Sequence, residues 1–220
     1  LVSAFNKGTF IAPLSTKFTK NSKIANELRK ESEKLITSPV IGFKAGGTGK
    51  AALKAWGEKE PFYASIFKKN LLKSNGSVKI NKYTLGIELE VFFQIKKSFF
   101  NTNKKITEKN ISSVISHVGP CIEIIGYRQK KKGVTCLGDL VSDFGANVKF
   151  LIGKKQKFKK LPFHNLATSL YNKKSGQTVN GNTKAVYDSP VKSLMWLLNK
   201  VKKDGVNLNK DFLVFTGSTV

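Results

Sequence analysis

Cysteine, histidine, arginine and acidic residues are all scarce in this sequence of 220 residues. It contains two cysteines, two histidines and two arginines, and its 14 acidic residues face 39 Lys and Arg. Two cysteines are too few for a disulfide-stabilised secreted scaffold of this size. Two histidines leave little room for a Ser-His-Asp or Cys-His catalytic set. A P-loop is also excluded, because Ala51 follows Gly49 and Lys50 where Ser or Thr is required.

A zinc site is not supported by the Cys and His residues. The spacing of His117, Cys121, Cys136 and His164 matches no common zinc-binding pattern. Each cysteine is therefore expected to be an ordinary small buried residue.

Long apolar runs are missing as well. The densest apolar stretch, Leu194–Leu198, is far too short to span a bilayer, and the N-terminus lacks the apolar core of a signal peptide. Hydrophobic residues nevertheless make up 40% of the chain, enough for a substantial core. We expect a soluble, cytoplasmic protein that does not bind membranes, with one sizeable domain or a domain plus a small helical cap.

The formal net charge of +25 comes almost entirely from lysine, since Arg29 and Arg128 are the two arginines. Proteins that read bases or clamp phosphates favour arginine forks, and the lysines are spread along the chain. This pattern predicts a solvated basic surface with weak, salt-sensitive and unselective affinity for polyanions. Specific recognition of nucleic acid is not expected.

Periodicity and capping signals predict a mixture of helices and strands. The predicted helices are Ser22–Ile36 with Ser22 as N-cap, Lys50–Trp56, Thr107–His117 with Thr107 as N-cap, and Val191–Lys203 with Ser189 as N-cap. The predicted strands are Val40–Phe43, Tyr83–Ile95, Cys121–Tyr127, Val148–Ile152 and Phe212–Phe215. Ser175–Lys184 is predicted to be a polar loop or hairpin with Asn180 and Gly181 at its tip.

Three glutamates stand out because they lie on apolar strands of an acid-poor chain. Glu88 and Glu90 point to the same face of their strand, about 7 Å apart, and Glu123 lies among β-branched residues. Carboxylates are costly to bury unless they are paired or bind a metal. One interpretation is a hard divalent cation, Mg²⁺ or Mn²⁺, held by the three. The other is that they face outward and pair with lysines.

Lys44 is a second candidate for chemistry. It follows the apolar segment Val40–Phe43 and precedes a glycine-rich turn. Burial at this position would lower the pKa of Lys44 toward the range that proton transfer requires, while nearby carboxylates would raise it again, so the net direction stays open. The alternative is a surface charge, as most lysines of this chain must be.

The order of several short motifs resembles the 2-keto-4-pentenoate hydratase family of the fumarylacetoacetate hydrolase superfamily. The similar segments are Ile11–Leu14, Gly42–Gly46, Glu60–Tyr63, Gly86–Glu90, Pro120–Ile125 and Ser189–Gly217. The chain departs from the family pattern at Phe62, Ala64, Asp143–Ala146 and Ser189, which leaves the substrate and the proton-transfer partners of Lys44 open.

The resemblance implies an α+β fold, with mixed β-sheet layers of the fumarylacetoacetate hydrolase-like β-roll and a helical N-terminal part. It implies residues 1–38 as that helical part and 39–220 as the catalytic domain, with a C-terminal end that is truncated relative to the family. Glu88, Glu90 and Glu123 match the metal ligands, Lys44 matches a catalytic residue, and Thr216 and Gly217 match the substrate-binding segment. We expect a homo-oligomer.

The function that the resemblance implies is a metal-dependent hydratase, which adds water to a 2-hydroxypenta-2,4-dienoate-type acid and gives a 4-hydroxy-2-oxo acid. Decarboxylation of a 4-oxalocrotonate-type acid and hydrolysis of an acylpyruvate are alternatives on the same scaffold. A catalytically silent basic binding protein is the alternative from another class, and it is favoured if the glutamates bind no metal.

Overall fold

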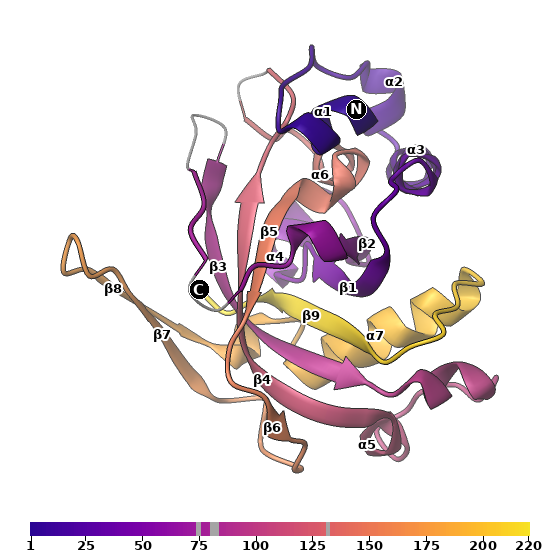
Figure 1. Cartoon of the computed structure of the whole chain (residues 1–220), viewed down its shortest axis with the longest axis vertical. Helices are drawn as coiled ribbons and strands as arrows, with labels where there is room; N and C mark the ends of the chain where they lie inside the picture. Colours follow the sequence, from indigo (N-terminus) through magenta and orange to yellow (C-terminus); the bar gives the residue numbers. More distant parts are fainter. Residues whose placement is uncertain (74–75, 80–83, 131–132) are drawn as a thin grey trace.

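The computed structural model describes residues 1–73, 76–79, 84–130 and 133–220. Its helices are α1 (Val2–Lys7), α2 (Thr16–Thr19), α3 (Ser22–Lys34), α4 (Lys50–Ala55), α5 (Ile111–Val114), α6 (Leu137–Ser142) and α7 (Pro190–Lys203). Its strands are β1 (Val40–Gly46), β2 (Phe62–Phe67), β3 (Thr84–Ile95), β4 (Ile115–Gly126), β5 (Asn147–Ile152), β6 (Gln156–Lys157), β7 (Ala167–Tyr171), β8 (Thr178–Asn182) and β9 (Phe212–Ser218). Figure 1 shows a curled sheet with the N-terminal helices at one end.

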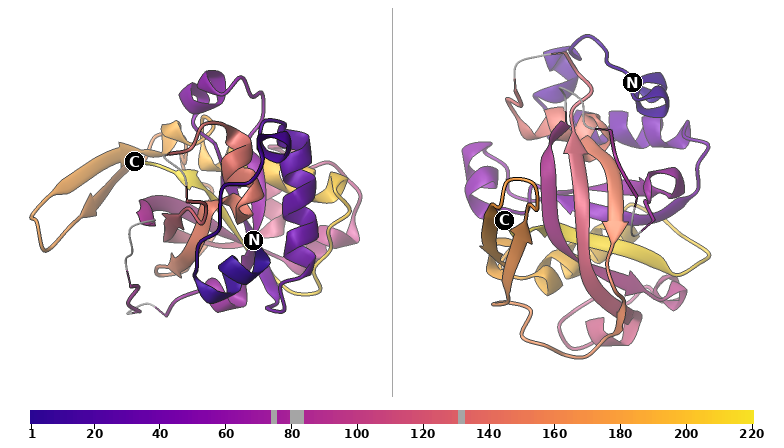
Figure 2. Two further views of the ribbon diagram at one scale, coloured as in Figure 1. Left: turned by 90° about the horizontal axis from the view of Figure 1, so that it is seen from above. Right: turned by 60° about the vertical axis from the view of Figure 1, so that its left-hand side comes forward.

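The main sheet has the strand order β2-β1-β9-β3-β4-β5, with β6 paired to β4. The β1–β9 pair is parallel, whereas β3 is antiparallel to both β4 and β9, so the sheet is mixed. Helix α7 covers one face, and its apolar side joins the largest hydrophobic cluster. Aromatic side chains of β3, β5 and β9 meet on the opposite face, which carries the candidate site. The α+β fold with mixed sheet layers is thus confirmed (Figure 2).

Helix α7 forms where the sequence predicts it. The Ser189 side chain accepts a hydrogen bond from Lys192 N at 3.1 Å, and Pro190 occupies the first turn. The buried side chains Leu194, Leu198 and Val201 recur at helical spacing and fix the face that contacts the sheet.

The N-cap predicted for α3 is wrong by one residue. Asn21, not Ser22, accepts hydrogen bonds from Lys23 N and Ile24 N at 3.0 and 3.2 Å. Ser22 lies in the first turn and its hydroxyl donates to Glu58. An asparagine at the N-cap is as favourable as a serine, so the sequence offers two adjacent candidates.

The helix predicted at Thr107–His117 is also largely wrong. Only α5 is helical, and Asn110 rather than Thr107 precedes it. Strand β4 begins at Ile115 because His117 pairs with Gln94 of β3 and with Lys157 of β6. These long-range pairings override the local helical pattern.

The hairpin is present, but its tip is displaced. Strands β7 and β8 pair over their full lengths, and the turn lies at residues 172–177. Gly181 lies inside β8, where a Cβ atom would approach Thr219 O to 2.0 Å. This glycine therefore permits close backbone packing instead of forming the turn. The hairpin projects from the body of the molecule (Figure 2).

The remaining predicted elements lie close to their expected positions. Strand β1 extends to Gly46 and β9 extends to Ser218, beyond the predicted ends. Strand β3 begins at Thr84, and Tyr83 lies outside the described residues. In the described part of the chain, no helix is long and apolar enough to cross a membrane.

The N-terminal segment contains the helices α1, α2 and α3, whereas the sequence pattern predicts only the helix at Ser22–Ile36. Phe5 and Ile36 pack with Phe67 and Phe144, and Ala25 of α3 packs in a cluster with residues of α4 and α6. The helices therefore share hydrophobic clusters with the rest of the chain instead of forming a separate core.

Candidate metal centre

Strand pairing brings the three glutamates together. The register of β3 and β4 places Glu88 directly opposite Glu123, and Glu90 lies two residues farther along β3 on the same face. Each of the three offers a carboxylate oxygen, and these oxygens lie within 4.8 Å of one another. Like charges directly opposite on neighbouring strands are destabilising. The centre therefore needs a cation or bound protons to offset its own repulsion.

The carboxylates at this centre are buried but incompletely hydrogen-bonded. Glu90 is 2% exposed and Glu123 is 0% exposed, whereas Glu88 is half-buried. Glu90 Oε2 accepts the backbone N–H of Gly217 at 2.8 Å. Among the described residues, Glu90 Oε1 and Glu123 Oε2 have no hydrogen-bond partner. Buried oxygens of this kind normally find a donor or a cation, so the set fits a hard divalent ion.

Lys44 lies in the same centre. Its side chain is buried, and its Nζ atom lies 3.1 Å from Glu123 Oε1. Burial lowers the pKa of Lys44, but the charges of Glu123, Glu88 and Glu90 more than offset this effect, so the pKa lies above its ordinary value. The direction of this pKa shift, which the sequence leaves open, is therefore upward and favours the ammonium form of Lys44.

Burial has the opposite effect on the acids. It raises the pKa of Glu90 well above its usual range, and the charges of Glu123 and Glu88 raise it further. It raises the pKa of Glu123 to about 7, with Lys44 opposing the shift and Glu88 adding to it. Burial beside Glu90 and Glu123 also raises the pKa of the Cys121 thiol, which is a free cysteine. The centre as a whole thus lacks positive charge.

Thr216 and Gly217 lie beside the carboxylates, and in this structure both make contacts within the protein. The Thr216 hydroxyl donates to Val91 O at 2.8 Å, and Gly217 N donates to Glu90. Gly217 has a φ of 112°, and a Cβ atom there would approach Thr48 Oγ1 to 2.1 Å. Glycine is therefore required if this backbone N–H is to reach the carboxylate. Substrate binding by these two residues stays a prediction.

A strained turn that sequence reasoning missed forms the wall behind Lys44. Phe144, Gly145 and Ala146 all have positive φ, at 52°, 70° and 59°. A Cβ atom on Gly145 would lie 2.8 Å from Lys44 Cε. The Phe62 ring also lies against this Cβ position, at 3.0 Å, and its centroid is 5.4 Å from Lys44 Nζ. Non-glycine residues in this conformation persist only where their surroundings enforce it.

Buried polar contacts hold that turn. Asp143 accepts hydrogen bonds from Arg128 N and Nη1 at 2.6 and 2.7 Å, and Asn147 Nδ2 donates to Phe144 O at 2.6 Å. Burial raises the pKa of Asp143, and Arg128 opposes the shift without cancelling it. The sequence does distinguish Arg128, because it is one of two arginines in a lysine-rich chain and arginine is the preferred cation for buried ion pairs.

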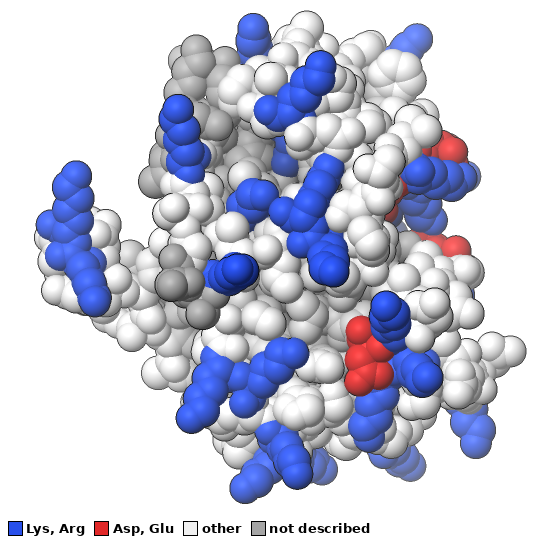
Figure 3. All heavy atoms as spheres, in the orientation of Figure 1, with Lys and Arg blue, Asp and Glu red and all other residues white. Residues whose placement is uncertain are grey.

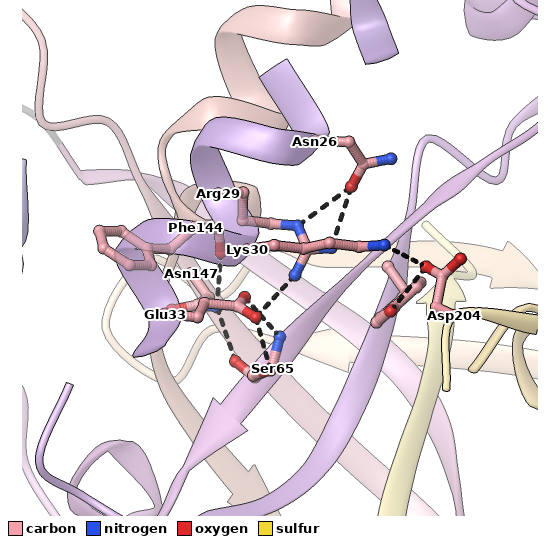
Figure 4. A network of polar contacts seen from close by, with 9 residues as sticks. Asn26, Arg29, Lys30, Glu33, Ser65, Phe144, Asn147 and Asp204 are labelled. Atoms are coloured by element: carbon pink, nitrogen blue, oxygen red, sulfur yellow. Dashed lines mark hydrogen bonds and ion pairs between the residues drawn. The ribbon is translucent and has the colours of Figure 1, made fainter. Parts of the chain in front are cut away.

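The second arginine fixes helix α3 to the sheet edge, as Figure 4 shows. Arg29 Nη1 lies 2.7 Å from Glu33 Oε2, and Glu33 accepts hydrogen bonds from the N and Oγ atoms of Ser65. Strand β2 is an edge strand, so Glu33 occupies a backbone donor that would otherwise be free. Ser65 adjoins Ala64, the β-sheet partner of Lys44. The contacts of α3 therefore reach the backbone beside the candidate site.

The Cys and His residues and the lysines are the other features that the sequence raises as candidates. In the described part of the chain, Glu88, Glu90 and Glu123 are the one group of three or more His, Cys, Asp or Glu residues whose ligand atoms lie close enough together to share a metal ion. The group contains neither Cys nor His. The lysines are scattered over the face in Figure 3 and are separated by uncharged surface, whereas acidic residues gather toward one edge.

Comparisons with known proteins show the fold. Neither a family model nor a curated protein matches the sequence. A solved structure of 4-oxalocrotonate decarboxylase from Pseudomonas putida G7, complexed with magnesium and adipate, superposes with a TM-score of 0.80 at 18% identity. The match covers 99% of this chain and 83% of that chain.

Two further structures share the fold less closely. Fumarylpyruvate hydrolase from Pseudomonas aeruginosa, in complex with Mn²⁺ and pyruvate, matches with a TM-score of 0.56 at 14% identity over 84% of this chain and 80% of that chain. A protein from Yersinia pestis CO92 that is assigned to the fumarylacetoacetate hydrolase family matches with a TM-score of 0.51 at 15% identity over 84% and 83%. The chain therefore has the fold of the fumarylacetoacetate hydrolase superfamily.

Proposed function

We propose that this chain is a metal-dependent enzyme that stabilises the enolate of a small 2-oxo acid. Its proposed reaction is the addition of water to a 2-hydroxypenta-2,4-dienoate-type acid, which gives a 4-hydroxy-2-oxo acid. The observation that carries the proposal is the convergence of three carboxylates, two buried and one half-buried, beside a buried lysine.

Glu88, Glu90 and Glu123 would hold one Mg²⁺ or Mn²⁺ ion. Such an ion supplies Lewis-acid stabilisation of negative charge on oxygen when it is bound. Three carboxylates carry three negative charges, which a divalent ion and the Lys44 ammonium together balance. Glu90 Oε1 and Glu123 Oε2, which have no hydrogen-bond partner among the described residues, are the oxygens that would bind the ion.

Lys44 is the proton donor in the proposed reaction. Its ammonium group lies beside Glu123 and is enclosed by Phe62 and Gly145, so it has little freedom to move away. A positioned ammonium can donate a proton to a carbon atom or an oxygen atom of the substrate and can recover one from water. Thr216 and Gly217 would contact the acid group of the substrate, since both adjoin Glu90.

Decarboxylation of a 4-oxalocrotonate-type acid is the second candidate. The decarboxylase structure from Pseudomonas putida superposes on 99% of this chain with a TM-score of 0.80, against 0.56 for the hydrolase. Loss of carbon dioxide from the carboxyl group remote from the 2-oxo group leaves the bonding electron pair delocalised onto the 2-oxo oxygen as a dienolate, and addition of water to a dienol also passes through an enolate. The carboxylate centre serves either reaction, and product analysis distinguishes them.

The test is an absorbance assay with purified 2-hydroxypenta-2,4-dienoate. We expect the dienol absorbance to fall when Mg²⁺ or Mn²⁺ is present and to stay constant after treatment with a chelator. Conversion of 4-oxalocrotonate with release of carbon dioxide, without conversion of the dienol, would replace the first candidate by the second. Failure to bind a divalent metal would favour the catalytically silent binding protein.

Lys44→Ala separates proton transfer from metal binding. We expect turnover to fall by about a hundredfold or more while the metal affinity persists. Lys50→Ala is the matched control, because Lys50 follows Lys44 by six positions in the chain. Its side chain is 67% exposed and pairs with Asp188. Full turnover in the Lys44 variant would contradict the role of Lys44 in proton transfer and would assign that role to a bound water.

The expected homo-oligomer is also a proposal. Tyr171 and Val179 of the projecting hairpin are 62% and 51% exposed, and an isolated two-stranded hairpin is marginally stable in water. Light scattering of the purified chain tests this expectation, and a monomer at micromolar concentration would contradict it.

A further inference from the structure

A cavity separate from the carboxylate centre lies between the N-terminal helix α1 and the ends of β4 and β5. Its volume is about 330 Å³. Thr84 and Gly126 line it, and they pair at the end of the β3–β4 ladder. Glu88 lies four positions after Thr84 on β3, which corresponds to about 13 Å along the strand. The cavity is therefore distinct from the candidate metal centre.

The cavity collects positive charge. Its described lining contains no acidic side chain, and it contains five cationic ones: Lys7, Lys69, Lys79, Arg128 and Lys149. Asp143 neutralises Arg128 from behind. None of the four lysines forms an ion pair within the described residues, whereas Lys30, Lys34 and Lys50 elsewhere on the surface each pair with an acid.

The lysine contacts inside the cavity use neutral acceptors. Lys69 Nζ donates to Asn6 Oδ1 and lies 4.7 Å from the centroid of the Phe5 ring. Lys149 Nζ donates to the backbone oxygen of Lys69 at 3.1 Å. Burial lowers the pKa of Lys69, and the charges of Lys149 and Arg128 lower it further. These cations repel one another, and a concave surface with apolar walls strengthens their combined field.

We infer that this cavity binds a small phosphate-bearing anion, with the phosphoryl group between Lys69 and Lys149. A dianionic group would give both lysines a charged acceptor and would relieve their mutual repulsion. The volume lies at the lower end of the range for small-molecule sites and exceeds the size of a phosphate group. Half-buried Phe10 and Val148 line the remaining space, so a phosphate ester fits better than free phosphate.

The test is titration calorimetry at low ionic strength with protein stripped of metal on a chelating resin. The resin avoids soluble chelators, which are themselves polyanions. The probes are inorganic phosphate, pyrophosphate and glycerol 3-phosphate. We expect saturable binding of one pyrophosphate per chain and tighter binding of the ester than of inorganic phosphate. Tighter binding of inorganic phosphate would overturn the assignment to a phosphate ester.

Lys69→Gln and Lys149→Gln should each weaken pyrophosphate binding by about tenfold or more, since each removes one charge-assisted hydrogen bond. Lys173→Gln and Lys184→Gln remove the same charge from exposed positions on or near the hairpin and should change the affinity less than twofold. Equal weakening in all four variants would show delocalised attraction and overturn the site. Absence of saturable binding up to about 10 mM would overturn it as well.

Discussion

Two groups of buried or half-buried acidic side chains in this protein have contrasting surroundings. Glu33, Asp143 and Asp204 each lie 2.7 to 2.8 Å from a nitrogen atom of Arg29, Arg128 or Lys30. Glu88, Glu90 and Glu123 instead lie against one another, and Lys44 is their one ion-pair partner within the described residues. A chain with 39 cationic residues has no shortage of counter-ions. The comparison teaches that the paired acids have their charges balanced within the fold, whereas the clustered acids have one cationic partner for three carboxylates.

The largest expected effect on stability is at Asp143. Asp143→Ala leaves the buried Arg128 guanidinium without its counter-ion and releases the strained turn behind Lys44. We expect the free energy of unfolding to fall by about 3–5 kcal/mol, as for other broken buried ion pairs. Urea denaturation measures this. Asp188→Asn removes the charge of an exposed ion pair and suits the φ of 71° at this position, so it should leave the midpoint unchanged. Equal effects of the two substitutions would refute the structural role of Asp143.

A pair of isosteric substitutions sharpens the comparison in metal-stripped protein. Glu33→Gln removes the charge that holds Arg29 and Ser65, and should cost about 1.5–3 kcal/mol. Glu90→Gln removes one of three mutually repelling charges and retains an oxygen for Gly217 N, so stability should stay constant or rise. Similar losses in both variants would show that the two kinds of acid do not differ.

Asp204 should give the smallest effect, and one that depends on pH. Burial raises the pKa of Asp204, but hydrogen bonds from Lys30 and Tyr63 and the charge of Lys200 outweigh it, so the pKa lies below its ordinary value of 3.8. A carboxyl group with a depressed pKa contributes stability above its unfolded-state pKa and loses it as the pH falls. Asp204→Asn should therefore lose less stability than the wild type below pH 3.8. Parallel urea midpoints across that range would contradict this expectation.

Much of the fold follows from local sequence signals. Helix α7 has a serine N-cap, a proline in the first turn and a continuous apolar face, and all three operate in the structure. Where the prediction is wrong, distant segments decide. Ile115–Gly126 is extended because β3 and β6 pair with it, and Gly181 is a packing glycine because Thr219 lies against it. Neither neighbour is visible in the local pattern.

In the candidate site as well, local sequence signals predict some features and distant segments decide the others. Alternation along β3 predicts that Glu88 and Glu90 share a face. The position of Glu123 opposite Glu88 depends on the register between two strands separated by a long connection, which the pattern of one strand does not define. The wall at Gly145 and the N–H donor of Gly217 are backbone features. The sequence could not predict them, because a glycine does not reveal what packs against it.

The most direct test of the account is a Mn²⁺ titration of the metal-stripped protein, with free Mn²⁺ followed by electron paramagnetic resonance. We predict one bound Mn²⁺ per chain, and affinities weakened by about tenfold or more in Glu88→Gln, Glu90→Gln and Glu123→Gln. Glu33→Gln, which alters a paired acid, should bind as the wild type does. Wild-type affinity in Glu90→Gln, or equal weakening in Glu33→Gln, would contradict the assignment of the clustered carboxylates as the metal centre.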